Sequence, residues 1–442
     1  MSMTSNSGSI IFSFRVSVLF AYGNILIITC RKRAVKQFIR RWNAGTSAHP
    51  YEETKFFSVF YFGAYAKLLI FVSGNAILLT PKANKADGTE RIMRFLTAGE
   101  SHGKYLMGIL EGIPANLEID STAINAELKR RQAGYGRGGR MQIESDTVEF
   151  VAGIRGGITT GAPIGFLIAN RDYENWSGII GAQATRTDER RVTAVRPGHA
   201  DLAGCIKYAQ RDARNILERA SARETAVKVV IGAIAKQYLR EVGVGVSSRI
   251  LQVGGVDADA EQAVKDKIDA CLAEGDTLGG VLRVSAFGLP VGIGSHIACD
   301  KRLEYKLCAS LMAIPSVKSV SVGDISAAIS GTGSEFHDAL YYNKNGKMTR
   351  KTNRAGGIEG GMSNGEDIVI TLGLKPIPSV PAGIPSVDIE TKQNTVSARE
   401  RGDTCVLPAA GVVAEAISET LGGDHMDEVR ARMKLKREAA KL

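Results

Sequence analysis

The stretch that determines the fold is 213–240, ARNILERASARETAVKVVIGAIAKQYLR, which is the longest helical pattern in the chain. Ile216, Val227 and Ile234 recur at helical spacing and belong to a broad apolar face. This spacing predicts one continuous helix that stops near Gly243, because glycine commonly ends helices. The other elements of the chain are placed relative to this helix.

Strands are predicted on both sides of this helix, and they come in adjacent pairs. The predicted strands are 93–98, 106–113, 148–154, 163–169, 244–253, 279–287, 318–322 and 367–374. The other predicted helices are 121–132, with Ser121 as its cap, 260–273, 302–313 and 409–421. Paired strands, rather than strict strand–helix–strand units, favour an α+β fold with antiparallel sheets.

Composition and charge indicate a globular protein that binds a small anion. The chain has 442 residues, enough for two to three domains, and 44% of them are hydrophobic. Residues 1–92 hold 12 Lys and Arg but only 4 Asp and Glu, so they carry most of the net charge of +10. The nearly neutral remainder favours an anionic small molecule. A nucleic-acid-binding protein is the alternative that the overall charge suggests.

The cysteines indicate a reducing compartment. The chain has six, without a CxxC pair and without the spacing of a metal finger. We expect reduced thiols in a cytoplasmic protein and no metal site. No G-x-G-x-x-G follows a predicted strand, so a dedicated nicotinamide domain is not expected either.

Residues 1–92 differ from the rest of the chain. Two largely apolar runs, Ile10–Cys30 and Phe56–Leu79, have about the length of a membrane span, but each is interrupted by a basic residue. We expect this extension not to belong to the native protein, whose natural start is Met93; a membrane-associated arm is the alternative. The domain prediction is therefore an extension that is non-native, disordered or membrane-adhering, followed by a functional domain at 93–442.

Four short segments carry the candidate chemistry. Thr97–Gly103 reads TAGESHG, Arg196–Asp201 reads RPGHAD, Arg219–Thr225 reads RASARET and Arg399–Cys405 reads RERGDTC. Glycine lets the backbone approach a ligand closely, and the histidine in each of the first two segments exchanges protons near neutral pH. The small residues of the third segment suit either a flat ring near the backbone or close helix packing.

His102 and His199 are candidate general acids, since each lies in a glycine-flanked segment beside carboxyl groups. Each could instead hold a turn or a helix start through hydrogen bonds, with Asp201 as a first-turn acid. Asp403, taken alone, is better interpreted as a surface carboxylate paired with a neighbouring arginine. The sequence leaves these alternatives open.

A basic, glycine-rich loop follows the predicted helix at 121–132. Its basic residues fall within twelve positions and are Lys129, Arg130, Arg131, Arg137 and Arg140. Guanidinium groups bind phosphate and carboxylate bidentately, so the loop is a candidate anion site. The same cluster could be a solvated helix end whose positive charge suits the helix dipole.

Taken together, these segments resemble the chorismate synthase family, from Met93 to about His425. The combination carries the resemblance, since no single segment is specific. It implies an α+β fold with helices sandwiched between antiparallel β-sheets, in a homotetramer. It also implies a lyase of the shikimate pathway of aromatic amino acid biosynthesis. That enzyme eliminates phosphate from 5-enolpyruvylshikimate 3-phosphate in the anti 1,4 sense to give chorismate, using reduced FMN without net redox change.

The resemblance also implies roles for individual residues. His102 would protonate or hydrogen-bond the departing phosphate, His199 would supply a proton to the reduced flavin, and Asp403 would help to remove the substrate proton. Arg131 and Arg137 match positions usually assigned to NADP contact; we favour the phosphorylated substrate, with NADPH as an indirect reductant. The residues implied to contact FMN are Arg219, Ala220, Ser221, Pro315, Ser316, Gly360, Lys375, Pro376, Ile377, Pro378, Ser379 and Arg401.

The chain departs from the family pattern at two places. Ala220 stands where serine is common, and Pro315-Ser316 stands where Asn-Ala is a frequent pair. Neither change matters if the contacts use backbone atoms. A flavin-dependent oxidoreductase with the same pocket is a further alternative, and it would turn over nicotinamide.

Overall fold

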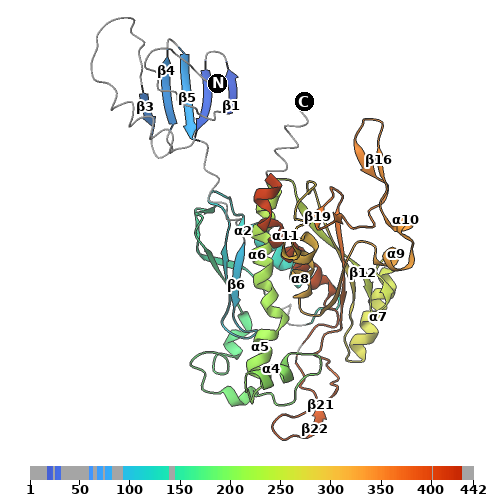
Figure 1. Ribbon diagram of the computed structural model, residues 1–442. Helices are drawn as coiled ribbons and strands as arrows, with labels where there is room; N and C mark the ends of the chain where they lie inside the picture. Colours follow the sequence, from blue (N-terminus) through green and yellow to red (C-terminus); the bar gives the residue numbers. More distant parts are fainter. Residues whose placement is uncertain are drawn as a thin grey trace, which may run out of the picture. The chain divides into compact units, whose positions relative to one another are not determined.

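The chain forms two compact units, Met1–Glu90 and Arg91–Leu442, in the computed structural model (Figure 1). The structure describes residues 93–138, 145–400 and 402–430, together with the backbone of the strands between Ser17 and Pro81. Nothing in these ranges is a helix long and apolar enough to cross a membrane.

The first unit is a five-stranded sheet, in which the two apolar runs of the sequence form strands. Its members are β1 (Ser17–Tyr22), β2 (Ile25–Cys30), β3 (Val59–Phe62), β4 (Lys67–Val72) and β5 (Asn75–Pro81), in the order β1-β2-β5-β4-β3. Neighbours are antiparallel except β2 and β5, which run parallel.

The second unit begins with a four-stranded antiparallel sheet in the order β6-β7-β11-β8. Its strands are β6 (Arg94–Ala98), β7 (Tyr105–Glu111), β8 (Val148–Ala152) and β11 (Ile164–Ala169). Along β7 burial alternates, with Leu106 and Leu110 fully buried and Met107 and Ile109 exposed. This period of two shows that one face of the sheet packs on the core. A small hairpin, β9 (Ile154–Arg155) with β10 (Ile158–Thr159), follows β8.

The other large sheet has five strands in the order β13-β12-β14-β20-β15, and every pair is antiparallel. These strands are β12 (Gly245–Val253), β13 (Val256–Asp257), β14 (Gly280–Phe287), β15 (Val317–Val322) and β20 (Ile368–Leu374). Three hairpins complete the described strands: β16 (Leu340–Tyr342) with β17 (Met348–Arg350), β18 (Ile358–Glu359) with β19 (Met362–Ser363), and β21 (Pro385–Val387) with β22 (Asn394–Val396).

Three helices connect the two sheets of this unit: α2 (Ser121–Gln132), α6 (Thr225–Arg240) and α11 (Leu407–Asp424). Helix α6 contacts α2, α11 and β7, and α11 contacts β12 and β14 (Figure 1). The backbones of α6 and α11 approach so closely that a Cβ on Gly232 would lie 2.3 Å from the Cα of Ala416. The buried apolar residues of both sheets and all three helices form one continuous core.

The remaining helices are shorter or peripheral. The α-helices are α4 (Asp201–Lys207), α5 (Arg214–Ala220), α7 (Glu261–Ala273), α8 (Leu303–Met312), α9 (Ile325–Ser330) and α10 (Gly333–Phe336). The 3₁₀ turns are η1 (Arg171–Asn175), η2 (Thr187–Arg190), η3 (Ala222–Glu224) and η4 (Cys299–Lys301). Mixed helices and antiparallel sheets confirm the predicted α+β class.

Two local predictions were wrong. The single helix expected at 213–240 is divided into α5, η3 and α6, because Ser221 adopts an extended backbone (φ −65°, ψ 142°). The Ser221 side chain accepts a hydrogen bond from the backbone N–H of Arg223, a capping role that serine favours over a helix interior. The second error concerns the cap of α2, which is Asp120 rather than Ser121.

Candidate active site

A cavity of about 660 Å³ opens where the helix break meets segments from the rest of the second unit. Its walls come from the turn after β6, the end of α2, the break between α5 and α6, the loop after β20 and the segment that enters α11. The basic side chains in its lining are Arg131, Arg137, Arg196, Arg223, Lys375 and Arg399, against two carboxylates, Glu400 and Asp403. Apolar residues of α11, including Ala409, Ala410 and Val413, form another wall.

His102 lies buried in the tight turn between β6 and β7. Its Nδ1 lies 2.9 and 3.0 Å from the two carboxylate oxygens of Glu218, and its ring stacks on Trp176 with centroids 3.9 Å apart. Burial raises the pKa of Glu218, but hydrogen bonds and charge from His102 and the charge of Arg214 outweigh it, so the pKa lies below its usual value. An ionised Glu218 accepts a hydrogen bond from the Nδ1–H, which leaves Nε2 as the nitrogen that exchanges protons.

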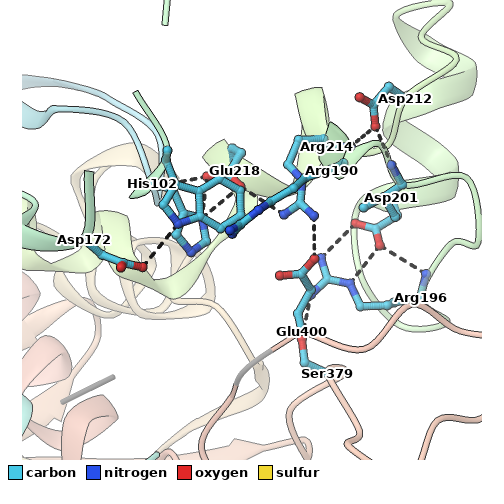
Figure 2. A network of polar contacts seen from close by, with 12 residues as sticks. His102, Asp172, Arg190, Arg196, Asp201, Asp212, Arg214, Glu218, Ser379 and Glu400 are labelled. Carbon is cyan, nitrogen blue, oxygen red and sulfur yellow. Dashed lines mark hydrogen bonds and ion pairs between the residues drawn. The ribbon is translucent and has the colours of Figure 1, made fainter. Parts of the chain in front are cut away.

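His199 is held in the same way by a different carboxylate. Its Nδ1 donates to Asp201, which is fully buried and also accepts from Arg196 at 2.9 and 3.1 Å. Burial raises the pKa of Asp201, yet its bonds to His199 and Arg196 hold it well below its usual value. Arg196 also donates to the Ser379 hydroxyl at 2.6 Å, which ties the loop after β20 to this cluster (Figure 2).

A buried arginine pair forms the next part of the lining. Arg223 donates twice to Asp146, each time at 2.7 Å. Arg131 donates from Nε to Thr225 and from Nη2 to the Ala222 carbonyl, both at 3.0 Å, so it holds the helix break in place. Burial, with the nearby Arg223 charge, lowers the pKa of Arg131 to about 10, at which the side chain is still charged at neutral pH. Within the described ranges its Nη1 makes no hydrogen bond and lies 3.7 Å from a carboxylate oxygen of Asp146.

Arg137 and Asp403 both line the cavity, and they form an ion pair with each other. The guanidinium of Arg137 bonds to Asp403, and the backbone N–H of Gly138 donates to the other carboxylate oxygen at 2.7 Å. A Cβ on Gly138 would lie 2.5 Å from the Gly402 carbonyl, so glycine is needed for this close approach. Arg137, 266 positions away in the sequence, is thus a partner of Asp403 that the sequence did not indicate, while Arg401, one of the neighbouring arginines expected to pair with it, lies outside the described residues.

The structure brings most of the residues predicted to contact FMN into this cavity. Those in the lining are Ala220, Ser221, Pro315, Ser316, Lys375, Ile377, Pro378 and Ser379. Ser316 has a φ of +72°, a strained conformation for a non-glycine residue that is typical of functional sites. The pKa of Lys375 is lowered by burial and by the nearby charge of Lys318.

Three predicted contacts lie outside the lining, and one cannot be placed. Arg219 is exposed and donates to the Thr97 carbonyl at 2.9 Å. Gly360 forms the turn between β18 and β19, and Pro376 is absent from the cavity wall. Arg401 lies outside the described residues, as does Arg140 of the basic loop.

Several residues that organise the site were not singled out from the sequence. Glu218, Asp146, Arg223 and Trp176 are all buried, and each orients a residue of the cavity wall. The sequence sign of Glu218 was its position as a charged residue within the largely apolar helical pattern at 213–240. In the described residues no cluster of three or more His, Cys, Asp or Glu is arranged to hold a metal ion.

The arrangement suits proton transfer next to a bound anion. Two histidines each have Nδ1 on an ionised carboxylate, and six basic side chains line the same space. Helix α11 begins at Leu407 beside the cavity, so its positive dipole end also favours negative charge there. The cavity volume lies in the range of roughly 300–1,000 Å³ that is usual for small-molecule sites.

Comparisons with known proteins agree on one family. Residues 93–426 match the family model of chorismate synthase. The chorismate synthase of Alkaliphilus metalliredigens is 44% identical over 375 residues, covering 78% of this chain and 99% of the relative. That of Thermoanaerobacter pseudethanolicus is 47% identical over 347 residues, covering 76% and 96%. A crystal structure of chorismate synthase matches with a TM-score of 0.62 at 34% identity, over 80% of this chain and 99% of that one. By its sequence and its fold, the chain belongs to the chorismate synthase family.

Proposed function

We propose that the cavity binds 5-enolpyruvylshikimate 3-phosphate beside reduced FMN and eliminates phosphate to give chorismate. The lyase activity and its place in the shikimate pathway follow from the family. The observation that carries the assignment to this cavity is its charge: among the described lining residues, six Lys and Arg side chains outnumber two carboxylates. The substrate bears one phosphate and two carboxylates, so it needs such a surplus of cations.

We assign two of the lining arginines to holding the cavity walls and two others to binding the substrate. Arg223 and Arg196 each already bind a buried carboxylate, so they fix the walls. Arg131 uses Nε and Nη2 to hold the helix break, and its Nη1 is the group we assign to the substrate phosphate. Arg137, bound to Asp403, is assigned to a second anionic group of the same ligand.

The residues present fit reduced FMN. Ala220 and Ser221 at the helix break allow a flat ring near the backbone, and the strained Ser316 faces the same space. Lys375 is the cation we assign to the flavin phosphate, and Ile377 and Pro378 supply apolar contact. When bound, reduced FMN supplies electron density that starts phosphate loss and recovers it without net redox change.

The histidines and Asp403 then carry the protons. His102 gives a proton or a hydrogen bond to the departing phosphate, and His199 keeps a proton available beside the flavin. Because Nδ1 of each ring is held by an ionised carboxylate, each acts through Nε2. Asp403, within reach of the Arg137 charge, helps to take up the proton that leaves substrate carbon.

The proposal also covers the layers of the fold, the oligomeric state, the location and the domain bounds of the protein. The contacts of α6 with β7 and of α11 with β12 support the family's helix layer between two antiparallel sheets. We propose a homotetramer in the cytoplasm, with NADPH at most an indirect reductant. We also propose that the functional domain is 93–442 and that residues 1–92 are dispensable, since all the cavity residues come from the second unit.

The test is phosphate release from 5-enolpyruvylshikimate 3-phosphate, measured with photoreduced FMN in the absence of oxygen. Release should require reduced FMN and should stop when oxygen is admitted. Adding Arg137→Ala as a matched variant locates the activity, because it removes a cavity cation without touching either histidine. Phosphate release that is equal with and without flavin would contradict the proposal.

A further inference from the structure

Figure 2 shows a polar network that extends from His102 through Glu218 and Arg214 to Glu400. We propose that Glu218 is a positioning residue: it fixes the ring of His102 in one orientation with a proton on Nδ1, so that Nε2 faces the departing group. The inference rests on the proposed role of His102, and it adds a residue that never touches the substrate.

The first support is the number of bonds that Glu218 makes to one residue. Its carboxylate accepts from the backbone N–H of His102 at 2.9 Å and from Nδ1 of the same residue at 2.9 and 3.0 Å. Its side chain is only 2% exposed, so these bonds form in a medium that screens them poorly. The imidazole is therefore fixed in both position and tautomer.

Hydrogen bonds also hold the turn that carries His102 against α5, the helix that contains Glu218. The backbone N–H of Ser101 donates to the Glu218 carbonyl at 2.9 Å. On the other side, Asn170 donates from its amide to the Gly103 carbonyl at 2.6 Å. Helix α5 thus holds the turn through both the backbone and the side chain of one residue, which leaves the ring little freedom to rotate.

The charged groups near the ring are held by partners of their own. Arg214 donates to Glu218 at 3.3 Å and to Glu400 at 2.8 Å. Arg190 lies against Trp176, with its guanidinium carbon 4.0 Å from the centroid of the indole that stacks on His102. The carboxylate bonded to Nδ1 is that of Glu218, so this group determines the tautomer of the neutral ring.

A second buried carboxylate, which is bonded to Trp176 where Glu218 is bonded to Nδ1 of His102, provides a matched control. Asp172 is buried and accepts from the indole nitrogen of Trp176 at 3.2 Å. Asp172→Asn therefore removes a buried charge at the edge of the indole, while Glu218→Gln removes the charge that contacts Nδ1. Glu218→Asp keeps the charge on a shorter side chain.

The kinetic experiment compares kcat and KM for phosphate release in the wild type and the three variants. Glu218→Gln should lower kcat by roughly 10–100-fold, as lost partners of functional histidines typically do, while KM and flavin binding change little. Glu218→Asp should recover part of the lost kcat, because it keeps a hydrogen-bond acceptor for Nδ1. Asp172→Asn should leave kcat within about twofold of the wild type, because the bond from Nδ1 to Glu218 is kept.

A spectroscopic readout keeps this inference separate from the proposed function. The chain has only six histidines, so ¹⁵N spectra of histidine-labelled protein can be assigned with a His102→Asn variant. The neutral ring of His102 should carry its proton on Nδ1 in the wild type, whether or not the protein turns over the substrate. A proton on Nε2 would overturn the inference, as would an unchanged kcat in Glu218→Gln or an equal loss of kcat in Asp172→Asn.

Discussion

Replacing Arg131 with alanine should weaken substrate binding without removing flavin. Two of the three guanidinium nitrogens of Arg131 are engaged by Thr225 and Ala222, and Nη1 makes no hydrogen bond to the described residues. The charge-assisted bond from Nη1 to phosphate is therefore the interaction that concerns the substrate, while the bonds from Nε and Nη2 concern the fold of the helix break. Such a bond contributes about 1.5–3 kcal/mol, so KM for the substrate should rise roughly 10–150-fold.

The neighbouring residue supplies the control. Arg130 lies on the same turn of α2, but its guanidinium is directed to Glu415 and Glu127 and is absent from the cavity wall. Arg130→Ala should lower the melting temperature, because Glu415 is buried and loses a bidentate partner, yet KM should stay within about twofold of the wild type.

The assay is anaerobic phosphate release at varied substrate with reduced FMN in excess, together with flavin fluorescence to measure FMN affinity. KM for the substrate should rise in Arg131→Ala and should stay near the wild-type value in Arg130→Ala. Equal KM values for the two variants, or a loss of flavin affinity that matches the loss of substrate affinity, would refute the assignment of Nη1 to the substrate.

Three further predictions concern other parts of the chain. His102→Ala and His199→Ala should each lower turnover by about 10²–10⁴-fold while FMN still binds; wild-type rates in both would remove them as acids. Burial, only partly offset by Lys236, raises the pKa of Glu419 to about 8, so stability should fall as the pH rises from about 4.5 through 8. Glu419→Gln should abolish that fall in thermal melts, and identical pH profiles would show that Glu419 is not its source. A chain beginning at Met93 should match the full chain in turnover and melting temperature; failure to fold would make residues 1–92 part of the enzyme.

The regular elements could be predicted well because their periodicity is local. The helix at 121–132 has the predicted bounds, and the strands at 244–253 and 367–374 differ from the observed β12 and β20 by one residue at the start. In each case the apolar spacing and the nearby turn residues act within a few positions. The antiparallel class followed from the pairing of successive strands.

The break at Ser221 could not be predicted in the same way. Apolar residues keep helical spacing on both sides of it, from Ile216 to Val227, so the pattern alone favours one helix. What ends α5 is a set of tertiary bonds, in which Arg131 binds the Ala222 carbonyl and Arg223 binds Asp146. Long-range contacts of this kind override a local preference, and here they create the cavity wall.

The carboxylates that bond the two histidines were hard to predict from the sequence for a similar reason. His102 and Glu218 are 116 positions apart, and nothing in either segment indicates that they meet. Asp201 lies two residues from His199, and the sequence does place these two together, although as a helix start rather than as a buried cluster with Arg196. The motifs thus located the site, while the geometry shows how each ring is oriented.

The most direct test of the central claim follows phosphate and flavin in one anaerobic cuvette. A limiting amount of photoreduced FMN is mixed with the protein and excess 5-enolpyruvylshikimate 3-phosphate, and released phosphate is measured while the flavin absorbance is recorded. A lyase without net redox change should release many phosphates per flavin while the flavin stays reduced. One product for each flavin oxidised, or turnover that depends on nicotinamide, would show an oxidoreductase and contradict the assignment.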